Sequence, residues 1–142
     1  MKVKQCMSNQ VEYLSSNATV KDCAKLMSEK HIGCVPVCDA MKNIVGLVTD
    51  RDLILRGVAC GKDSIHTPLS DIMSTKVYSC PEGADVEEAK KIMSENQIRR
   101  LPITDESGKI VGIVTLANLC KNTEDVGQTL ENICECNKKN AE

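Results

Sequence analysis

The sequence predicts a mixed α/β fold made of two similar halves, each with the order strand, helix, strand, strand, helix. The chain repeats itself: a shift of 66 residues aligns 7–53 with 73–119 without a gap, and 18 positions are identical. Each copy contains one amphipathic helical pattern and two short apolar runs of strand length. Two copies that are too small to bury their own apolar faces are expected to pack on each other as a pseudo-twofold pair.

The first strand of each copy is expected at 11–14 and at 76–80, just before the helix. In the first copy, Thr19 and Asp22 match a capping box at the start of the helix. The face expected to be buried contains Val20, Cys23, Ala24 and Met27.

In the second copy, Asp85 and Glu88 replace this cap. The face expected to be buried there contains Val86, Ala89 and Met93.

Each helix is followed by two apolar runs, which we expect to form hairpins at 34–48 and at 100–114 with turns at 39–42 and 105–108. The runs are continuous rather than alternating, which is typical of sheets covered on both faces. Pro36 and Pro102 lack an amide hydrogen, so one edge of their strand is expected to be free of ladder bonding. A second helix is expected after Thr49 and after Thr115.

The polar segment 57–68 contains glycine and proline and is expected to link the copies. The predicted domains are therefore 1–64, 65–122, and a tail at 123–142. In the tail, Val126, Leu130 and Ile133 recur at helical spacing, which predicts a short amphipathic helix with a frayed, charged end.

The composition excludes several classes of function. The 142 residues carry a net charge of −2, which gives no broad attraction to nucleic acid or to an anionic membrane. Phe and Trp are absent, so base stacking on aromatic rings is excluded as a main binding mode. No stretch resembles a signal peptide or a membrane span, so we expect a soluble, cytoplasmic protein. In that compartment the nine cysteines are expected to be reduced and packed as small hydrophobic residues.

No catalytic pattern stands out. His31 and His66 have no partner motif, and HExxH, GxSxG and P-loop signatures are absent, so we expect no catalytic residues and no enzyme activity. Cys134 and Cys136, like Cys34 and Cys38, are not joined by a second pair at zinc spacing. We therefore expect no metal site and no required cofactor.

The strand-to-helix corner at 46–52, here the first corner, is more informative. Asp52 lies one helical turn after Thr49, so both side chains can face one cleft. A carboxylate offers two acceptor oxygens, which match the vicinal hydroxyls of a ribose, and the threonine hydroxyl adds a third group. An alternative explains the same residues equally well, because threonine is a good N-cap and aspartates suit a first helical turn.

Arg99 and Arg100 stand at the start of an otherwise apolar strand. The planar fork of donors on arginine suits phosphate, although ion pairing with Glu95 or Asp105 is the alternative. The equivalent positions in the first copy are Gly33 and Cys34, which carry no charge. That asymmetry is easier to explain by ligand contact than by folding.

Several motifs together resemble a tandem pair of cystathionine-β-synthase (CBS) domains, also called a Bateman module, over roughly residues 2–121. The motifs are Cys6-Met7-Ser8, Ile72-Met73-Ser74, the IGCVPV and IRRLPI strands, and the GLVTDRDL corner. The resemblance implies β-α-β-β-α domains with sheets face to face, two related clefts that bind adenosine compounds, and a homodimer.

The resemblance also implies roles for individual residues. Thr49 and Asp52 would hold the ribose, while Arg99 and Arg100 from the other copy, with Arg51, would meet the phosphates. At 112–118, here the second corner, Thr115 is retained but Asn118 replaces the acid. An amide has one oxygen and no charge, so we expect a weak or empty second site.

The resemblance therefore implies a non-catalytic sensor module for AMP, ADP or ATP, acting on an unidentified protein partner. The arginines favour phosphates and so disfavour S-adenosylmethionine. NAD is also expected to be a less favoured ligand. Two alternatives stay open: a redox- or metal-responsive interaction module that uses the thiols, and a structural dimer with relic clefts.

Overall fold

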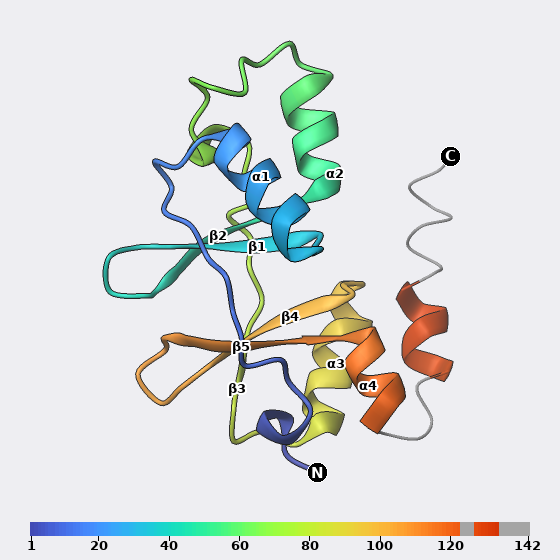
Figure 1. Cartoon of the computed structure of the whole chain (residues 1–142). Helices are drawn as coiled ribbons and strands as arrows, with labels where there is room; N and C mark the ends of the chain where they lie inside the picture. Colours follow the sequence, from blue (N-terminus) through green and yellow to red (C-terminus); the bar gives the residue numbers. More distant parts are fainter. Residues whose placement is uncertain (123–126, 134–142) are drawn as a thin grey trace. The chain divides into compact units, whose positions relative to one another are not determined.

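The structure is a computed structural model that describes residues 1–122 and 127–133, and it divides into two compact units (Figure 1). One unit is Glu12–Val77, and the other joins Met1–Val11 to the chain from Tyr78 onward. Each unit contains one small sheet and its helices, so the predicted mixed α/β fold is confirmed.

The unit Glu12–Val77 contains a two-stranded sheet. Its elements in chain order are α1 (Val20–Lys30), β1 (Cys34–Cys38), β2 (Ile44–Thr49), α2 (Asp50–Asp52), the π-helical η2 (Leu53–Val58) and the 3₁₀ turn η3 (Leu69–Asp71). The helix expected after Thr49 is therefore α2 continued by η2.

The other unit contains a three-stranded sheet in the order β3-β4-β5. Its elements are the 3₁₀ turn η1 (Val3–Gln5), β3 (Cys80–Pro81), α3 (Val86–Asn96), β4 (Arg100–Thr104), β5 (Ile110–Thr115) and α4 (Leu116–Asn122).

The two hairpins have the same register, as the repeat predicts. Cys34 lies opposite Thr49 in the first, and Arg100 lies opposite Thr115 in the second. An aspartate organises each turn: the Asp39 carboxylate accepts bonds from the amides of Met41 and Asn43, and Asp105 does the same for Ser107 and Lys109. The predicted turns are confirmed because short aspartate side chains bond their own following backbone.

The first strand of each copy is shorter than predicted. The segment 11–14 makes one parallel bridge, in which the Leu14 amide donates to the Pro36 carbonyl at 3.1 Å and the Cys38 amide donates to the Leu14 carbonyl at 2.9 Å. Of the segment 76–80, only Cys80 is in a strand, the two-residue β3, which continues to Pro81 and runs parallel to β4. The edge beside each proline is thus only partly paired, since Pro supplies no amide hydrogen to a ladder.

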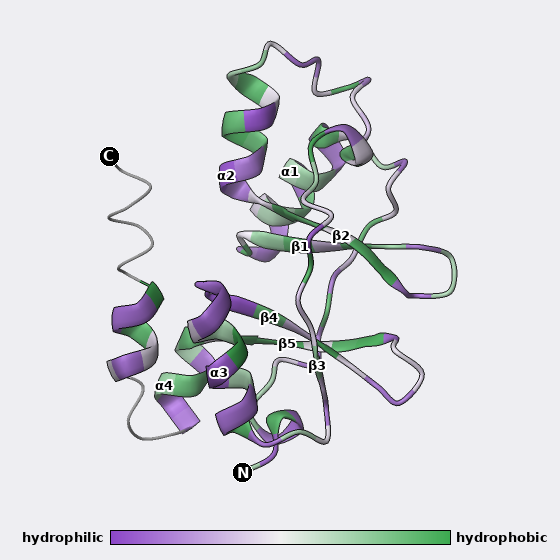
Figure 2. Ribbon diagram, turned by 180° about the vertical axis from the view of Figure 1, so that it is seen from behind, coloured by the Kyte–Doolittle hydropathy of each residue, from purple (hydrophilic) through white to green (hydrophobic). Residues whose placement is uncertain are grey.

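The expectation of continuous burial holds for one strand of each hairpin. All five residues of β1 are buried, and so are four of the five in β4, whereas β2 and β5 alternate between more and less buried positions. The sequence runs of β2 and β5 contain no charged residue and are apolar up to a final threonine, so their alternation could not be read from hydropathy (Figure 2).

The helix caps are confirmed in part. Thr19 and Asp22 bond reciprocally, with the Thr19 amide donating to Asp22 Oδ2 at 3.0 Å and the Asp22 amide donating to Thr19 Oγ1 at 3.1 Å. At α3, the side chain of Asp85 accepts from the amide of Glu87, so the predicted role of Glu88 is wrong. Ala24 is exposed instead of buried, because the packed face of α1 turns toward Leu26, which lies against the core beside Val20, Cys23 and Met27.

The two Met–Ser segments, Met7–Ser8 and Met73–Ser74, each complete the sheet of the opposite repeat. Ser74 exchanges two backbone bonds of 2.9 Å with Leu47 of β2. Ser8 exchanges bonds of 2.9 and 3.0 Å with Ile113 of β5. Each compact unit therefore contains the Met–Ser segment of the other repeat. The ranges 1–64 and 65–122 describe the repeats and stay a prediction.

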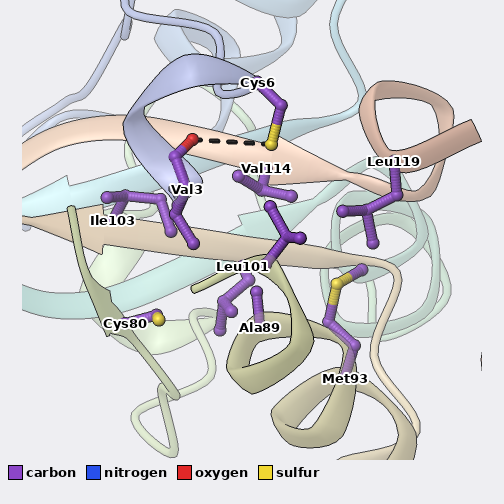
Figure 3. Close-up of a cluster of buried hydrophobic side chains, with 10 residues drawn as sticks. Val3, Cys6, Cys80, Ala89, Met93, Leu101, Ile103, Val114 and Leu119 are labelled. Atoms are coloured by element: carbon purple, nitrogen blue, oxygen red, sulfur yellow. Dashed lines mark hydrogen bonds between the residues drawn. The ribbon is translucent and has the colours of Figure 1, made fainter. Parts of the chain in front are cut away.

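Each unit has its own hydrophobic core, built mainly from aliphatic side chains and cysteines. In Figure 3, Val3 and Cys6 meet side chains from β3, α3, β4, β5 and α4. The other core includes Leu69 and Ile72 among the residues of α1, β1, β2 and η2. Each core is therefore closed by apolar residues that come just before a Met–Ser segment.

The tail is helical over 127–133, the part that the structure describes. Thr129 and Ile133 are buried there, and the Gln97 side-chain amide donates to the Asn132 carbonyl at 3.3 Å. Leu130 is 46% exposed, so its predicted place on the buried face is wrong. Val126 and the charged end lie outside the described residues.

Across the described ranges, none of the helices has the length and apolar character needed to traverse a bilayer.

Candidate functional site

The structure brings Thr49 and Asp52 together at the first corner. Thr49 ends β2 and caps α2: its amide donates to Asp52 Oδ2 at 2.9 Å, and the Asp52 amide donates to Thr49 Oγ1 at 3.2 Å. This reciprocal pair is a capping box. The structural explanation of these two residues is therefore confirmed, and the ribose-binding explanation stays a prediction.

The capping box uses only part of the acceptor capacity of Asp52. Its Oδ2 accepts the Thr49 amide, while its Oδ1 lies 3.8 Å from Arg56 Nε, which is an ion-pair distance longer than a hydrogen bond. The Asp52 side chain is 18% exposed. A carboxylate has about four lone-pair sites on its two oxygens, so Asp52 can cap the helix and still accept bonds from a ligand.

Uncharged groups border the first corner. Cys34 lies opposite Thr49 in the hairpin, and the Gly33 carbonyl accepts the Asp50 amide at 3.0 Å. Burial raises the pKa of the Cys23 thiol to about 12, with Cys34 and Asp52 adding to the rise through their charge. The Cys23 thiol is thus neutral at neutral pH, and Asp52 is the acidic group that adds to this rise.

The second corner has the same backbone geometry as the first, but its side chains leave fewer hydrogen-bond acceptors free. The amide and hydroxyl of Thr115 both donate to Asn118 Oδ1, at 2.9 and 3.0 Å, and the Asn118 amide donates to Thr115 Oγ1 at 3.1 Å. An amide oxygen has two lone pairs. Both are therefore occupied within the corner, which leaves Asn118 only its donor group to offer a ligand.

Arg99 and Arg100 flank the second corner of their own unit. Arg100 pairs opposite Thr115, and the Arg99 carbonyl accepts the Leu116 amide at 3.1 Å. Arg99 is exposed and Arg100 is half-buried. Thr49 and Asp52 belong to the other unit, so the predicted meeting of these arginines with the first corner stays a prediction.

The acidic partners considered for these arginines have other contacts. Glu95 lies 3.9 Å from the Lys91 ammonium, and Asp105 accepts bonds from its own turn. The ion-pair alternative for Arg99 and Arg100 thus gains no support from Glu95 or Asp105.

The third predicted phosphate ligand, Arg51, is exposed on the first turn of α2, and its backbone amide donates to the Asp50 carboxylate.

Arg56 contacts the first corner but was not among the predicted residues. It lies one helical turn after Asp52, and its Nη1 donates to the carbonyls of Ile72 and Met73, both at 3.4 Å. The spacing of four residues between an acid and an arginine was the available sequence signal. The contacts with residues sixteen and seventeen positions further on had no such signal.

Neither histidine contributes to a visible metal site. His66 Nδ1 lies 2.7 Å from Asp63 Oδ2 on the surface, and His31 ends α1 in a left-handed conformation. Within residues 1–122 and 127–133, no group of three or more histidine, cysteine or acidic side chains could hold a metal ion. Cys134 and Cys136 lie outside the described residues.

Sequence comparison finds relatives that span nearly the whole chain. The sequence profile of the CBS domain matches residues 3–58 and 69–125. The CBS domain-containing protein YhcV of Bacillus subtilis (strain 168) is 40% identical over 138 residues, which are 95% of this chain and 96% of YhcV.

Three solved structures share the fold. Hypoxic Response Protein I, solved with two coordinated zinc ions, has a TM-score of 0.79 and 29% identity over 86% of this chain and 98% of its own. The CBS domain pair of MJ0100, in complex with 5′-methylthioadenosine and S-adenosyl-L-methionine, has a TM-score of 0.76 and 26% identity, covering 85% and 94%. CBSX2 in complex with AMP has a TM-score of 0.72 and 26% identity, covering 84% and 93%.

Proposed function

Because this chain belongs to the CBS-domain family and contains two such domains in tandem, we propose that it is a non-catalytic regulatory module that binds an adenosine nucleotide. Two structural neighbours support an adenosine ligand: MJ0100 binds 5′-methylthioadenosine and S-adenosyl-L-methionine, and CBSX2 binds AMP. Binding would shift the arrangement of the module by favouring one conformation over another, which a ligand does only through differential affinity.

The observation that carries the proposal is the difference between Asp52 and Asn118. Asp52 keeps an oxygen that can accept bonds, whereas the Asn118 oxygen is occupied by two donors from Thr115. A ribose presents two adjacent hydroxyl donors, so it needs an acceptor with spare capacity. We therefore place the ribose at Thr49 and Asp52 and regard the Thr115–Asn118 corner as a weak site.

Arg99, Arg100 and Arg51 are the proposed phosphate ligands. Guanidinium groups form paired, charge-assisted bonds with phosphate oxygens. Three such side chains favour AMP, ADP or ATP over S-adenosylmethionine, whose sulfonium end is cationic. NAD is also less favoured, as in the sequence-based prediction. We further propose that the protein acts as a homodimer on a separate protein partner.

Calorimetry with AMP, ATP and S-adenosylmethionine tests the site, with Asp52→Asn and Asn118→Asp as matched variants. Asn118 makes the equivalent bonds at the second corner, so Asp52→Asn is expected to remove the charge and the spare acceptor while keeping the fold. We expect one AMP per chain in the native protein and about tenfold weaker binding in Asp52→Asn, the cost of a charge-assisted bond.

The reciprocal variant gives the second half of this test. Asn118→Asp adds a carboxylate to the second corner and is expected to strengthen a second, weak binding event. Two equal sites in the native protein, or unchanged affinity in Asp52→Asn, would defeat the proposal. The latter result would favour a structural dimer with relic clefts.

A metal- or redox-responsive module is the second candidate, favoured by one observation: the neighbour Hypoxic Response Protein I was solved with two zinc ions. Against it, burial raises the pKa of Cys38 and of Cys80 to about 11, which disfavours the thiolate form that binds metal. Elemental analysis and thiol titration of anaerobically purified protein separate the candidates. About one metal ion per chain together with indifference to nucleotide would favour this second function.

A further inference from the structure

Arg56 connects the first corner to the second Met–Ser segment. Its Nε lies 3.8 Å from Asp52 Oδ1, and its Nη1 donates to the Ile72 and Met73 carbonyls at 3.4 Å each. The Arg56 side chain is 54% exposed, so these contacts are weak and easily redistributed. One guanidinium thus lies between the proposed ribose acceptor and a backbone segment from a distant part of the chain.

That backbone segment holds the sheet edge and leads out of the unit. Ser74 exchanges two 2.9 Å bonds with Leu47 of β2, and the Met73 side chain lies against Gly46. The unit ends at Val77, three residues later. Loss of the hydrogen bond from Arg56 to the Met73 carbonyl would therefore weaken the backbone pairing of Ser74 with Leu47 and loosen the connection that follows it.

The second corner lacks both the acid and the arginine. A shift of 66 residues places Asn118 at the position of Asp52 and Asn122 at that of Arg56. The Asn122 side-chain amide donates to the Asn118 carbonyl of its own helix at 2.8 Å. The unit that lacks the acceptor with spare capacity therefore also lacks a long cation at this position.

We propose that Arg56 is a positioning residue that couples ligand contact at Asp52 to the backbone pairing of Met73–Ser74 with β2. This inference rests on the proposed function. Ligand hydroxyls that donate to Asp52 Oδ1 compete with Arg56 for the same oxygen, so binding weakens the ion pair that positions the guanidinium. The bonds from Arg56 to the two carbonyls then weaken, and the Met–Ser segment opens more often.

Amide hydrogen exchange at Ser74 and Leu47 tests the coupling without any ligand. The variants are Asp52→Asn, Arg56→Met and the double variant, which form a double-mutant cycle. Each single change is expected to speed exchange at Ser74 by about two- to fivefold, the size of an exposed ion pair. The double variant should match Arg56→Met alone. Additive effects, or an unchanged rate in Arg56→Met, would overturn the inference.

Two controls separate this coupling from general loosening of the fold. Arg56→Lys keeps the charge and is expected to restore part of the slow exchange at Ser74. Asn122→Met, the matched change in the other unit, is expected to leave exchange at Ser8 and Ile113 unchanged. If Asn122→Met loosened Ser8 as much as Arg56→Met loosens Ser74, the contacts of Arg56 would have no special role.

A second arm uses AMP as the probe. AMP is expected to speed exchange at Ser74 in the native protein and to have no such effect in Arg56→Met. If AMP fails to bind the native protein, the proposed function is lost, and the ligand-free cycle still decides the role of Arg56. If AMP binds and speeds Ser74 exchange equally in Arg56→Met, the function stands and this inference is wrong.

Discussion

Met73 lies over Gly46 so closely that a Cβ added to the glycine would stand 2.5 Å from the methionine sulfur. The same added atom would be 3.2 Å from the Ser74 carbonyl oxygen. The second repeat has the same relationship, since a Cβ at Gly112 would meet the Met7 sulfur and lie 2.9 Å from the Ser8 carbonyl oxygen. Both glycines are thus required by the close approach of a Met–Ser segment to its strand.

Gly46→Ala is expected to destabilise the protein by about 1–3 kcal/mol, the usual cost of overpacking. The methionine side chain can move, but the backbone carbonyl at Ser74 is held by the pairing with Leu47. Urea denaturation measures the change. Gly83→Ala is the matched control, because an added Cβ there meets nothing within 4 Å. Equal stability of the two variants would contradict this account.

Thr19→Ala is expected to cost about 1 kcal/mol of stability, because it removes the side-chain oxygen that accepts the Asp22 amide at the start of α1. Thermal unfolding measures the loss. Thr19→Ser keeps the oxygen and should retain most of the stability. A serine variant as unstable as the alanine variant would show that the threonine methyl group matters more than the cap.

The Asp22 carboxyl should make stability fall in acid. The hydrogen bond from the Thr19 amide lowers the pKa of Asp22, so the charged form is favoured in the folded state. Its contribution is present above the unfolded pKa and is lost as the pH falls through the lower, folded pKa. Urea midpoints from pH 6 down to pH 3 should therefore fall more steeply in the native protein than in Asp22→Asn. Parallel curves would contradict the assignment.

Thiol labelling should divide the cysteines by burial. Cys60 and Cys120 are exposed and should react with a maleimide in the folded protein. Burial raises the pKa of Cys23 to about 12 and that of Cys80 to about 11, so these thiols should react only after unfolding. Peptide mass spectrometry after labelling identifies each site. Rapid labelling of Cys23 in native conditions would mean that α1 opens far more often than its packing indicates.

The C-terminal helical segment should contribute to stability through one side chain. Ile133 is 1% exposed, and Ile133→Ala is expected to cost about 2–4 kcal/mol. Leu130→Ala, at a position 46% exposed, should cost little. If both variants unfold at the same urea concentration, the segment does not pack on its unit as described.

Local chemistry explains what could be predicted from the sequence. The cap at Thr19, the aspartate turns at 39–42 and 105–108, and the proximity of Thr49 to Asp52 all depend on residues within four positions of each other. Such contacts are fixed by helix and turn geometry, which a repeat in the sequence shows twice. The hairpin was also predicted, although the pairing of Cys34 with Thr49 extends it one residue beyond the predicted range 34–48.

The features that were missed depend on distant parts of the chain or on small angular differences. The pairing of Ser8 with Ile113 spans about a hundred residues, and no local pattern indicates it. Ala24 and Leu130 were assigned to buried helix faces by spacing alone, but the width and direction of a face are set by what packs against it. Arg56 was missed because its partners at Ile72 and Met73 are likewise remote.

The crossing of the Met–Ser segments determines where the polypeptide can be divided. Cutting the chain between the repeats would leave the first sheet without its partner Ser74. The second sheet would lose its partner Ser8, so neither piece would be a whole folding unit. Residues 12–77, by contrast, include all the backbone partners of β2 that the structure describes, and they coincide with one compact unit.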